Sequence, residues 1–217
     1  MNEKIERVIR ALQKNNMAAE YAETAADARR RVKEMLFPGA VITAGGSQSL
    51  KESGVWELLE SSEYRFFDRT KPGMTEQERN EAFRAAIGCD FFFCSSNAVT
   101  EQGELINVDG TANRLSSICF GPKKVVMIVG INKIVADAQE GFLRVKKVAA
   151  PKNCVRLSMD TPCAKLGHCV SLLQKENPGI TDGCQCADRI CCEYLVSDRQ
   201  RRKDRIHVIL CGEELGY

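Results

Sequence analysis

Short apolar runs that alternate with helical segments constrain the fold of this chain more than any other feature. The runs fall at residues 40–43, 64–67, 90–94, 124–129 and 206–210. Apolar residues take consecutive positions in them, as in strands that are buried on both faces of a sheet. Helices between successive strands are typical of parallel sheets. The sequence therefore predicts an α/β fold with an open, mainly parallel sheet flanked by helices.

Helical periodicity and turn residues complete this outline. Apolar residues recur at helical spacing within 2–15, and further helices are expected at 24–36, 75–87 and 134–148. Thr24 is a candidate N-cap, and the Pro-Gly pair after residue 37 ends the second helix. Residues 99–108 predict a hairpin that turns near Gln102 and Gly103.

Composition and charge exclude several classes of protein. The chain has 217 residues, and its 31 Lys and Arg against 29 Asp and Glu give a net charge of +2. That balance argues against nucleic acid or a membrane surface as the main partner. The longest strongly apolar stretch, 125–129, is far shorter than the roughly 18 residues of a membrane span. We expect one domain over 1–217, located in the cytoplasm, with no nucleic-acid partner and no membrane insertion.

The first candidate site follows the strand at 40–43. Paired glycines, Gly45 and Gly46, allow a sharp turn and close approach of the backbone to a ligand. Ser47 or Ser49 can cap the next helix, whose free N–H groups attract anions. The segment is either a capped tight turn or part of an anion-binding site.

The second candidate site follows the strand at 90–94. Asn97, Thr100 and Glu101 lie beyond its carboxyl end, where ligands of α/β sheets usually bind. Glu101 is a candidate general acid/base or covalent nucleophile. The alternative is an exposed carboxylate in a hairpin.

Two further segments place cations near predicted strand ends. Asn113 and Arg114 follow the hairpin, and Asn132 and Lys133 follow the strand at 124–129. Arg114 and Lys133 could hold a phosphate or carboxylate. The alternatives are solvated charges and ordinary turn residues.

A cysteine-rich segment occupies about 160–195. The chain has eleven cysteines, an odd number that points to reduced thiols in the cytosol, and six of them lie here together with His168. Zinc or an iron–sulfur cluster takes four such ligands, although the spacing matches no simple pair of CxxC motifs. The alternative is a set of buried or redox-labile thiols. With only two histidines, a Ser-His-Asp or Cys-His hydrolase is poorly supported.

Taken in order, these motifs resemble the LUD-domain (lactate-utilisation) family of the LutC/YkgG type. The resemblance rests on the segments 45–49, 97–103, 113–114, 120–123, 129–135, 144–145, 150–153, 161–163, 167–169 and 188–191. It implies a NagB/RpiA/CoA-transferase-like fold and a role in the oxidation of L-lactate to pyruvate, alongside separate iron–sulfur subunits. In the CoA transferases of this fold group, a Glu in a Ser-Glu-Asn-Gly-like turn is the nucleophile. The segment 100–103 is similar, which makes Glu101 a catalytic candidate.

The cysteine tail departs from the family pattern. Members that carry it read Gly-x-Cys-x-Asp-Cys closely followed by Arg-Ile-Cys, whereas here residues 170–183 intervene. The resemblance implies a metal-ligand quartet with Cys186 and Cys192 as extra thiols. The quartet is Cys163, Cys169, Cys184 and Cys191.

Three functions remain open at this stage. The first is a component of 2-hydroxy-acid oxidation that binds a small anionic metabolite and acts with iron–sulfur oxidoreductase subunits or as a homo-oligomer. The second is an iron–sulfur or zinc accessory subunit without its own catalysis. The third is a transferase or isomerase of CoA esters or sugar phosphates.

Overall fold

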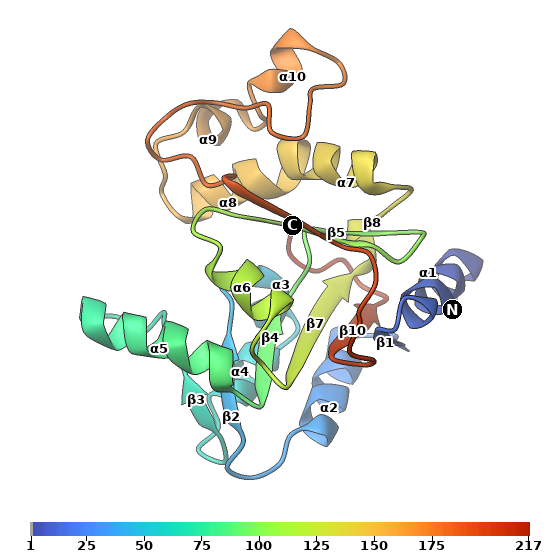
Figure 1. Cartoon of the computed structure of the whole chain (residues 1–217), viewed down its shortest axis with the longest axis vertical. Coiled ribbons are helices and arrows are strands. Elements are labelled where there is room, and N and C mark those ends of the chain that lie inside the picture. Colours follow the sequence, from blue (N-terminus) through green and yellow to red (C-terminus); the bar gives the residue numbers. More distant parts are fainter. Residues whose placement is uncertain (1) are drawn as a thin grey trace.

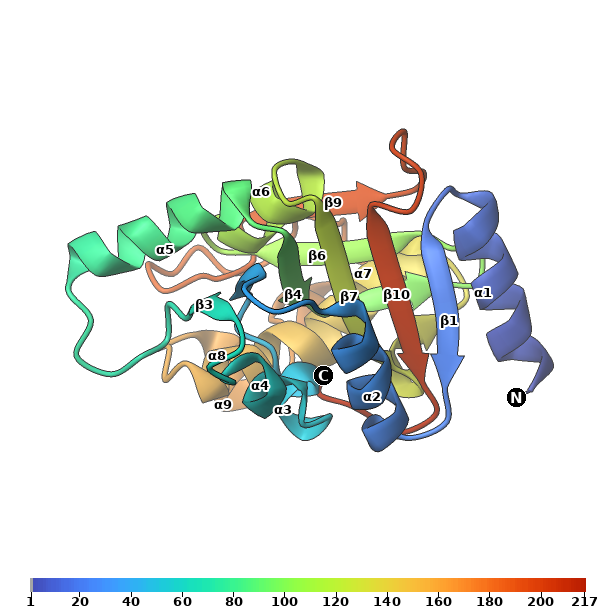
Figure 2. The ribbon, with the colours of Figure 1, turned by 90° about the horizontal axis from the view of Figure 1, so that it is seen from below.

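Six parallel strands form the central sheet of the computed structural model, which describes residues 2–217. Their order is β1-β10-β7-β4-β2-β3, and every neighbouring pair is parallel. The strands lie in the lower part of the molecule in Figure 1, and Figure 2 shows β4, β7, β10 and β1 side by side. The strands are β1 (Ala18–Ala22), β2 (Val41–Ala44), β3 (Arg65–Phe67), β4 (Phe91–Cys94), β7 (Lys124–Gly130) and β10 (Ile206–Cys211). The predicted α/β fold with a mainly parallel sheet is confirmed.

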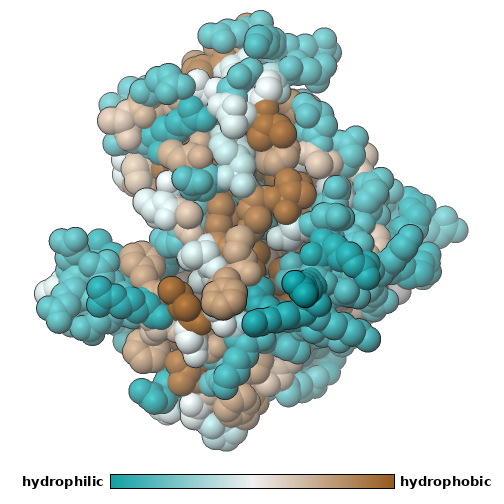
Figure 3. All heavy atoms as spheres, viewed as in Figure 1, coloured by the Kyte–Doolittle hydropathy of each residue, from teal (hydrophilic) through white to brown (hydrophobic). Residues whose placement is uncertain are grey.

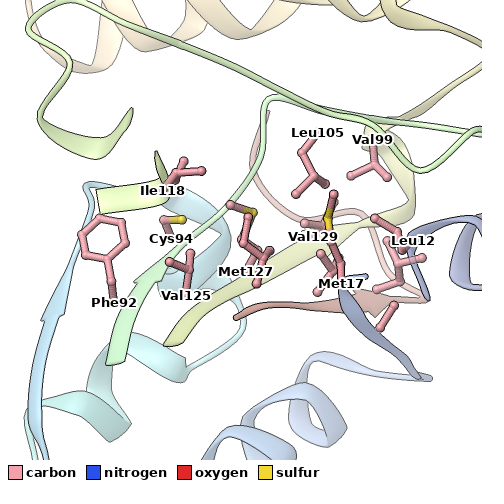
Figure 4. Packing of buried hydrophobic residues seen from close by; sticks show 14 of the residues in the cluster. Leu12, Met17, Phe92, Cys94, Val99, Leu105, Ile118, Val125, Met127 and Val129 are labelled. Carbon is pink, nitrogen blue, oxygen red and sulfur yellow. The ribbon is translucent and has the colours of Figure 1, made fainter. Parts of the chain in front are cut away.

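Helices cover both faces of this sheet, as the two-sided apolar runs predict. On one face, Met127 of β7 packs in a core that includes Leu12 and Ile118 (Figure 4). On the other face, Ile128 packs in a second core with Val32 and other helical residues. The helices are α1 (Glu3–Lys14), α5 (Glu76–Gly88) and α6 (Asn113–Cys119) against the first core, and α2 (Ala25–Met35), α3 (Gln48–Glu52) and α4 (Val55–Leu59) against the second.

A second sheet lies over the first core. Its order is β8-β5-β6-β9, and it consists of β5 (Ala98–Thr100), β6 (Leu105–Asp109), β8 (Ile134–Val135) and β9 (Glu193–Ser197). The pair β5–β6 is antiparallel, which confirms the predicted hairpin. Val99 and Leu105 face the central core, whereas Ala98 and Ile106 pack against Phe142. The small sheet therefore joins the central sheet to residues 138–192, which include most of the cysteine-rich segment and are called the cysteine-rich part below.

The cysteine-rich part is built on one continuous helical stretch. It contains α7 (Ala138–Arg144), a π-helical turn (Val145–Ala149) and α8 (Ala150–Arg156), and it lies above the sheets in Figure 1. Two short helices follow, α9 (Pro162–Leu166) and α10 (Ser171–Gln174). The predicted helix at 134–148 has the wrong bounds: residues 134 and 135 form β8, and the helical stretch starts at an Asp137 N-cap.

Exposed apolar side chains lie outside these cores. Phe120 is 67% exposed and Val155 is 61% exposed. Figure 3 shows the molecule from the same side as Figure 1. Hydrophobic residues gather in a band through the middle of the face seen there, and hydrophilic residues surround them. No helix within residues 2–217 is long and apolar enough to span a membrane.

Residues 199–205 carry four arginines and a lysine, and two of these arginines are used inside the fold. Arg205 is buried and donates to the carbonyls of Ser117 and Ile118 at the end of α6. Arg199 donates to the carbonyl of Lys14 at the end of α1. Part of this run therefore ties β10 to the helices of the first core.

Replacing Gly103 with alanine should lower stability by about 2–4 kcal/mol. Gly103 has φ +81°, and an added methyl group would lie 2.6 Å from the backbone of Ala11 and of Leu12. The control is Gly39→Ala, at φ +77° with no atom within 4 Å of the added methyl, which should cost only about 1–2 kcal/mol. Thermal unfolding of both variants checks this, and equal losses would contradict a clash with α1.

Candidate functional site

A cavity of about 370 Å³ opens at the carboxyl ends of β2, β4 and β7. Since these strands are parallel neighbours, the segments that follow them meet at one edge of the sheet. Residues of the cysteine-rich part, including Ala149 and Ile190, form the opposite wall. The cavity therefore lies between the central sheet and the cysteine-rich part.

Most of the ligand-binding residues predicted from the sequence line this cavity. They are Gly46, Ser47, Ser49, Asn97, Asn113, Arg114 and Lys133. The structure does not bring Gly45, Thr100, Glu101 or Asn132 into the lining.

Two of the residues outside the lining, Gly45 and Asn132, support the backbone around it, whereas Thr100 does not. Gly45 donates its N–H to the carbonyl of Phe93 (2.8 Å). The Asn132 side chain accepts from the N–H of Leu215 (3.2 Å) and donates to the carbonyl of Gly216 (3.1 Å), which fixes the C-terminal segment. Thr100 is fully buried and bonds within its own hairpin.

Glu101 lies on the β5–β6 turn against α1. Its carboxylate is 3.3 Å from Nζ of Lys4 and 3.2 Å from Nη2 of Arg7. Hydrogen bonds from Arg7 and Lys4 lower the pKa of this carboxyl group. The geometry gives Glu101 an ion-pairing role at the surface, and its catalytic role stays a prediction that the cavity does not support.

Arg114 organises the cavity wall, and its guanidinium is already fully engaged by the protein. Its five N–H donors reach Asp109, Asn107 and Asn97 side chains and the carbonyls of Ser95 and Val108, at 2.8–3.0 Å. Its ion pair with Asp109 is nearly buried, with side-chain exposures of 13% and 10%. Arg114 therefore positions the segments after β4 and β6.

Lys133 is the most unusual group in the lining. It is only 2% exposed, and its ammonium nitrogen lies 2.8 Å from Oγ of Ser49 and 3.1 Å from Oγ of Ser95. Within residues 2–217, no carboxylate lies within ion-pairing distance of Lys133. Burial, with the charges of Arg144 and Arg114, lowers its pKa to about 7.

Two arginines that sequence reasoning missed add positive charge to the lining. A methyl group on Gly46 would lie 3.8 Å from Nη2 of both Arg69 and Arg156, so the two guanidinium groups face the same glycine. Asn153 and Tyr217 hold Arg156 in place. Among the described residues, neither arginine forms an ion pair with a carboxylate. Arg69 follows β3, so strand-end reasoning could have found it, whereas the sequence gives no comparable signal for Arg156.

The predicted cysteine quartet lines a second, small cavity of about 20 Å³. Its lining includes Cys163, Cys169, Cys184 and Cys191. Two further thiols approach members of the quartet: Cys154 Sγ lies 3.6 Å from Cys163 Sγ, and Cys186 Sγ lies 3.2 Å from Cys184 Sγ. All the cysteines are free thiols. Within residues 2–217, no three His, Cys, Asp or Glu side chains are already arranged to hold a metal ion.

Comparison with known proteins agrees with this architecture. A family model described as the LUD domain matches residues 5–211. The chain belongs to the LUD-domain family. The fold of this LUD-domain protein is similar to the crystal structure of a DUF162 family protein from Deinococcus radiodurans, with a TM-score of 0.53, 13% identity and 97% of each chain covered. No curated protein matches the sequence of this chain.

Proposed function

We propose that this LUD-domain protein binds a small carboxylate- or phosphate-bearing metabolite in the strand-end cavity and takes part in the oxidation of a 2-hydroxy acid, L-lactate to pyruvate. The LUD family is associated with lactate utilisation. The observation that supports anion binding is the unbalanced positive charge of the cavity lining.

The charges of the lining explain why an anion is the expected ligand. Arg69 and Arg156 contribute cations, Lys133 adds a charge only when it is protonated, and Arg114 already neutralises Asp109. A carboxylate or phosphate would accept charge-assisted hydrogen bonds from the two guanidinium groups beside Gly46. The cavity volume lies within the usual range for sites that bind small molecules.

The oxidation needs an electron acceptor in addition to the anion site. We place that acceptor in iron–sulfur oxidoreductase subunits, the partners that the sequence resemblance implies. A second copy of this chain is the other expected partner. Co-purification with iron–sulfur subunits, together with the mass of the assembly in solution, tests this part of the proposal.

Thermal unfolding in the presence of candidate ligands tests the anion site. L-lactate or pyruvate at about 100 times its dissociation constant should stabilise the protein by about 2.7 kcal/mol. Stabilisation by CoA esters or sugar phosphates alone would favour the transferase or isomerase function. If none of these anions shifts the unfolding temperature, the proposal of an anion site is rejected.

The cysteine cavity supports a second proposal, a zinc or iron–sulfur centre. The four thiols come from parts of the chain up to 28 residues apart, and they line one cavity. Cationic groups lie next to it: Lys146 lines the cavity, and Arg189 donates to the carbonyls of Cys184 and Cys191. Positive charge of this kind stabilises thiolates and the anionic centres that they bind.

Metal analysis after anaerobic purification tests this second proposal. We expect about one zinc ion per chain, or iron with matching sulfide and a visible absorption band. The paired replacement Cys163→Ser and Cys169→Ser should remove the bound metal, whereas Cys119→Ser, at an exposed thiol on α6, should not. A metal-free, folded wild-type protein purified in this way would reject the quartet.

A further inference from the structure

Three side chains from neighbouring strand ends meet inside the strand-end cavity. Lys133 follows β7, Ser95 follows β4, and Ser49 lies in the first turn of the helix after β2. The Lys133 nitrogen lies within hydrogen-bonding distance of both hydroxyl groups, 2.8 Å from Ser49 and 3.1 Å from Ser95. All three residues line the cavity.

The hydroxyl protons of the two serines have different partners. The Ser49 hydroxyl donates to the carbonyl of Leu215 (3.1 Å), so its oxygen is an acceptor for Lys133. The protein acceptor for the Ser95 hydroxyl, the carbonyl of Ser96, is 3.4 Å away, which is long for such a bond. The Ser95 proton can therefore point to a neutral Lys133 nitrogen.

The surroundings of Lys133 favour the neutral amine that a base requires. Arg144 on α7 and Arg114 on α6 lower its pKa, whereas Glu52 on α3 and Cys94 on β4 act weakly in the opposite direction. With burial as the largest cause, the pKa falls to about 7. A substantial fraction of Lys133 is then unprotonated near neutral pH.

We propose that Ser95 is a nucleophile, that Lys133 is its general base, and that the pair catalyses acyl transfer from an ester or thioester. A nucleophile within hydrogen-bonding reach of a base, with the base oriented by a third group, is the usual arrangement for such chemistry. Here Ser49 orients Lys133, and Arg114 fixes the backbone carbonyl of Ser95 at 2.9 Å. Ser49 and Arg114 are positioning residues.

The proposed reaction balances without an oxidant. Ser95 Oγ forms a bond to the acyl carbon, and its proton passes to Lys133 Nζ. The acyl carbon then loses its alcohol or thiol leaving group, which takes the proton back from Lys133. Water, an alcohol or a thiol attacks the acyl-serine in the second half, with Lys133 accepting its proton and returning it to Ser95.

The substrate class follows from the cations in the same cavity. Arg69 and Arg156 would hold a carboxylate or phosphate on the acyl donor, so this assignment of substrate rests on the proposed anion site. The nucleophile itself does not need an anionic ligand. The two parts can therefore be tested separately.

A neutral fluorophosphonate, which reacts with activated serines, tests the nucleophile. Intact-mass and peptide analysis should show one adduct on Ser95, formed by attack of Oγ on phosphorus with loss of fluoride. The rate of labelling should rise as the pH increases through about 7, because the base acts only when Lys133 is deprotonated. Ser95→Ala should remove the adduct, and Lys133→Met should slow labelling by about 100-fold or more.

Ser117→Ala is the matched control for these variants. Ser117 is buried on α6, its hydroxyl donates to the carbonyl of Asn113 (3.5 Å), and it does not line the cavity, so this variant should be labelled at the wild-type rate. No adduct on Ser95 in folded wild-type protein, an adduct on Ser49, or a rate that does not change with pH would overturn the proposal. The pH profile keeps this test valid even if Lys133→Met does not fold. Thermal stabilisation by anions, measured on the same protein, shows separately whether the anion site fails.

Discussion

Replacing Arg114 with methionine should lower the free energy of unfolding by about 3–5 kcal/mol. Arg114 uses all five of its N–H donors within the protein, and its partner Asp109 has a side chain only 10% exposed. The methionine would leave a nearly buried carboxylate without its counter-charge and several acceptors without a donor. Chemical denaturation of the variant and the wild type measures this difference.

Arg30 provides a matched control on the surface. It forms ion pairs with Asp27 and Glu34 on α2, but its side chain is 57% exposed. Arg30→Met should therefore cost less than about 1 kcal/mol. Arg114→Lys should recover only part of the lost stability, because an ammonium group cannot reproduce the fork of donors. A loss below about 1 kcal/mol for Arg114→Met would show that the network does not stabilise the fold.

The central sheet could be predicted because its strands carry the chain's most continuous apolar runs. In β7, residues 125–129 are all fully buried, which requires apolar side chains on both faces. The sequence does not predict β1, because Ala18–Ala22 contains small residues and a glutamate. It pairs only with β10 at the edge of the sheet. β9 lies in the second sheet, where partly exposed residues leave no continuous apolar run.

The part of the candidate site that lies at the carboxyl edge of the central sheet could be predicted from the sequence. Gly46, Asn97 and Lys133 follow parallel neighbours, so strand-end reasoning brings them together correctly. The same reasoning misplaced Glu101, because β5 belongs to the second sheet and its end leads to α1. Which sheet a short strand joins depends on tertiary packing, and local sequence does not encode it.

Arg156 shows a second limit of sequence reasoning. It reaches the cavity because the helical stretch that starts in α7 continues through a π-helical turn into α8. The periodicity of 134–148 predicts an end to the helix before this residue. The position of Arg156 therefore depends on how α8 packs over the edge of the sheet, and no local sequence motif predicts this packing.

Replacing Arg69 or Arg156 with glutamine should weaken binding of the stabilising anion by about 10–100-fold each. A charge-assisted hydrogen bond contributes about 1.5–3 kcal/mol, and each replacement removes one guanidinium from the wall beside Gly46. Calorimetric titration with the anion that stabilises the wild type measures the loss. Arg84→Gln, at an exposed position on α5, is the control and should bind as the wild type does.

The double replacement shows whether both arginines hold the same group. If one carboxylate or phosphate contacts both guanidinium groups, the two replacements share a partner, and their combined loss should differ from the sum of the single losses by about 0.5 kcal/mol or more. Losses that simply add would place the arginines on separate parts of the ligand. Wild-type affinity in both single variants and in the double variant would contradict the anion site, because neither guanidinium group beside Gly46 would then contribute to binding.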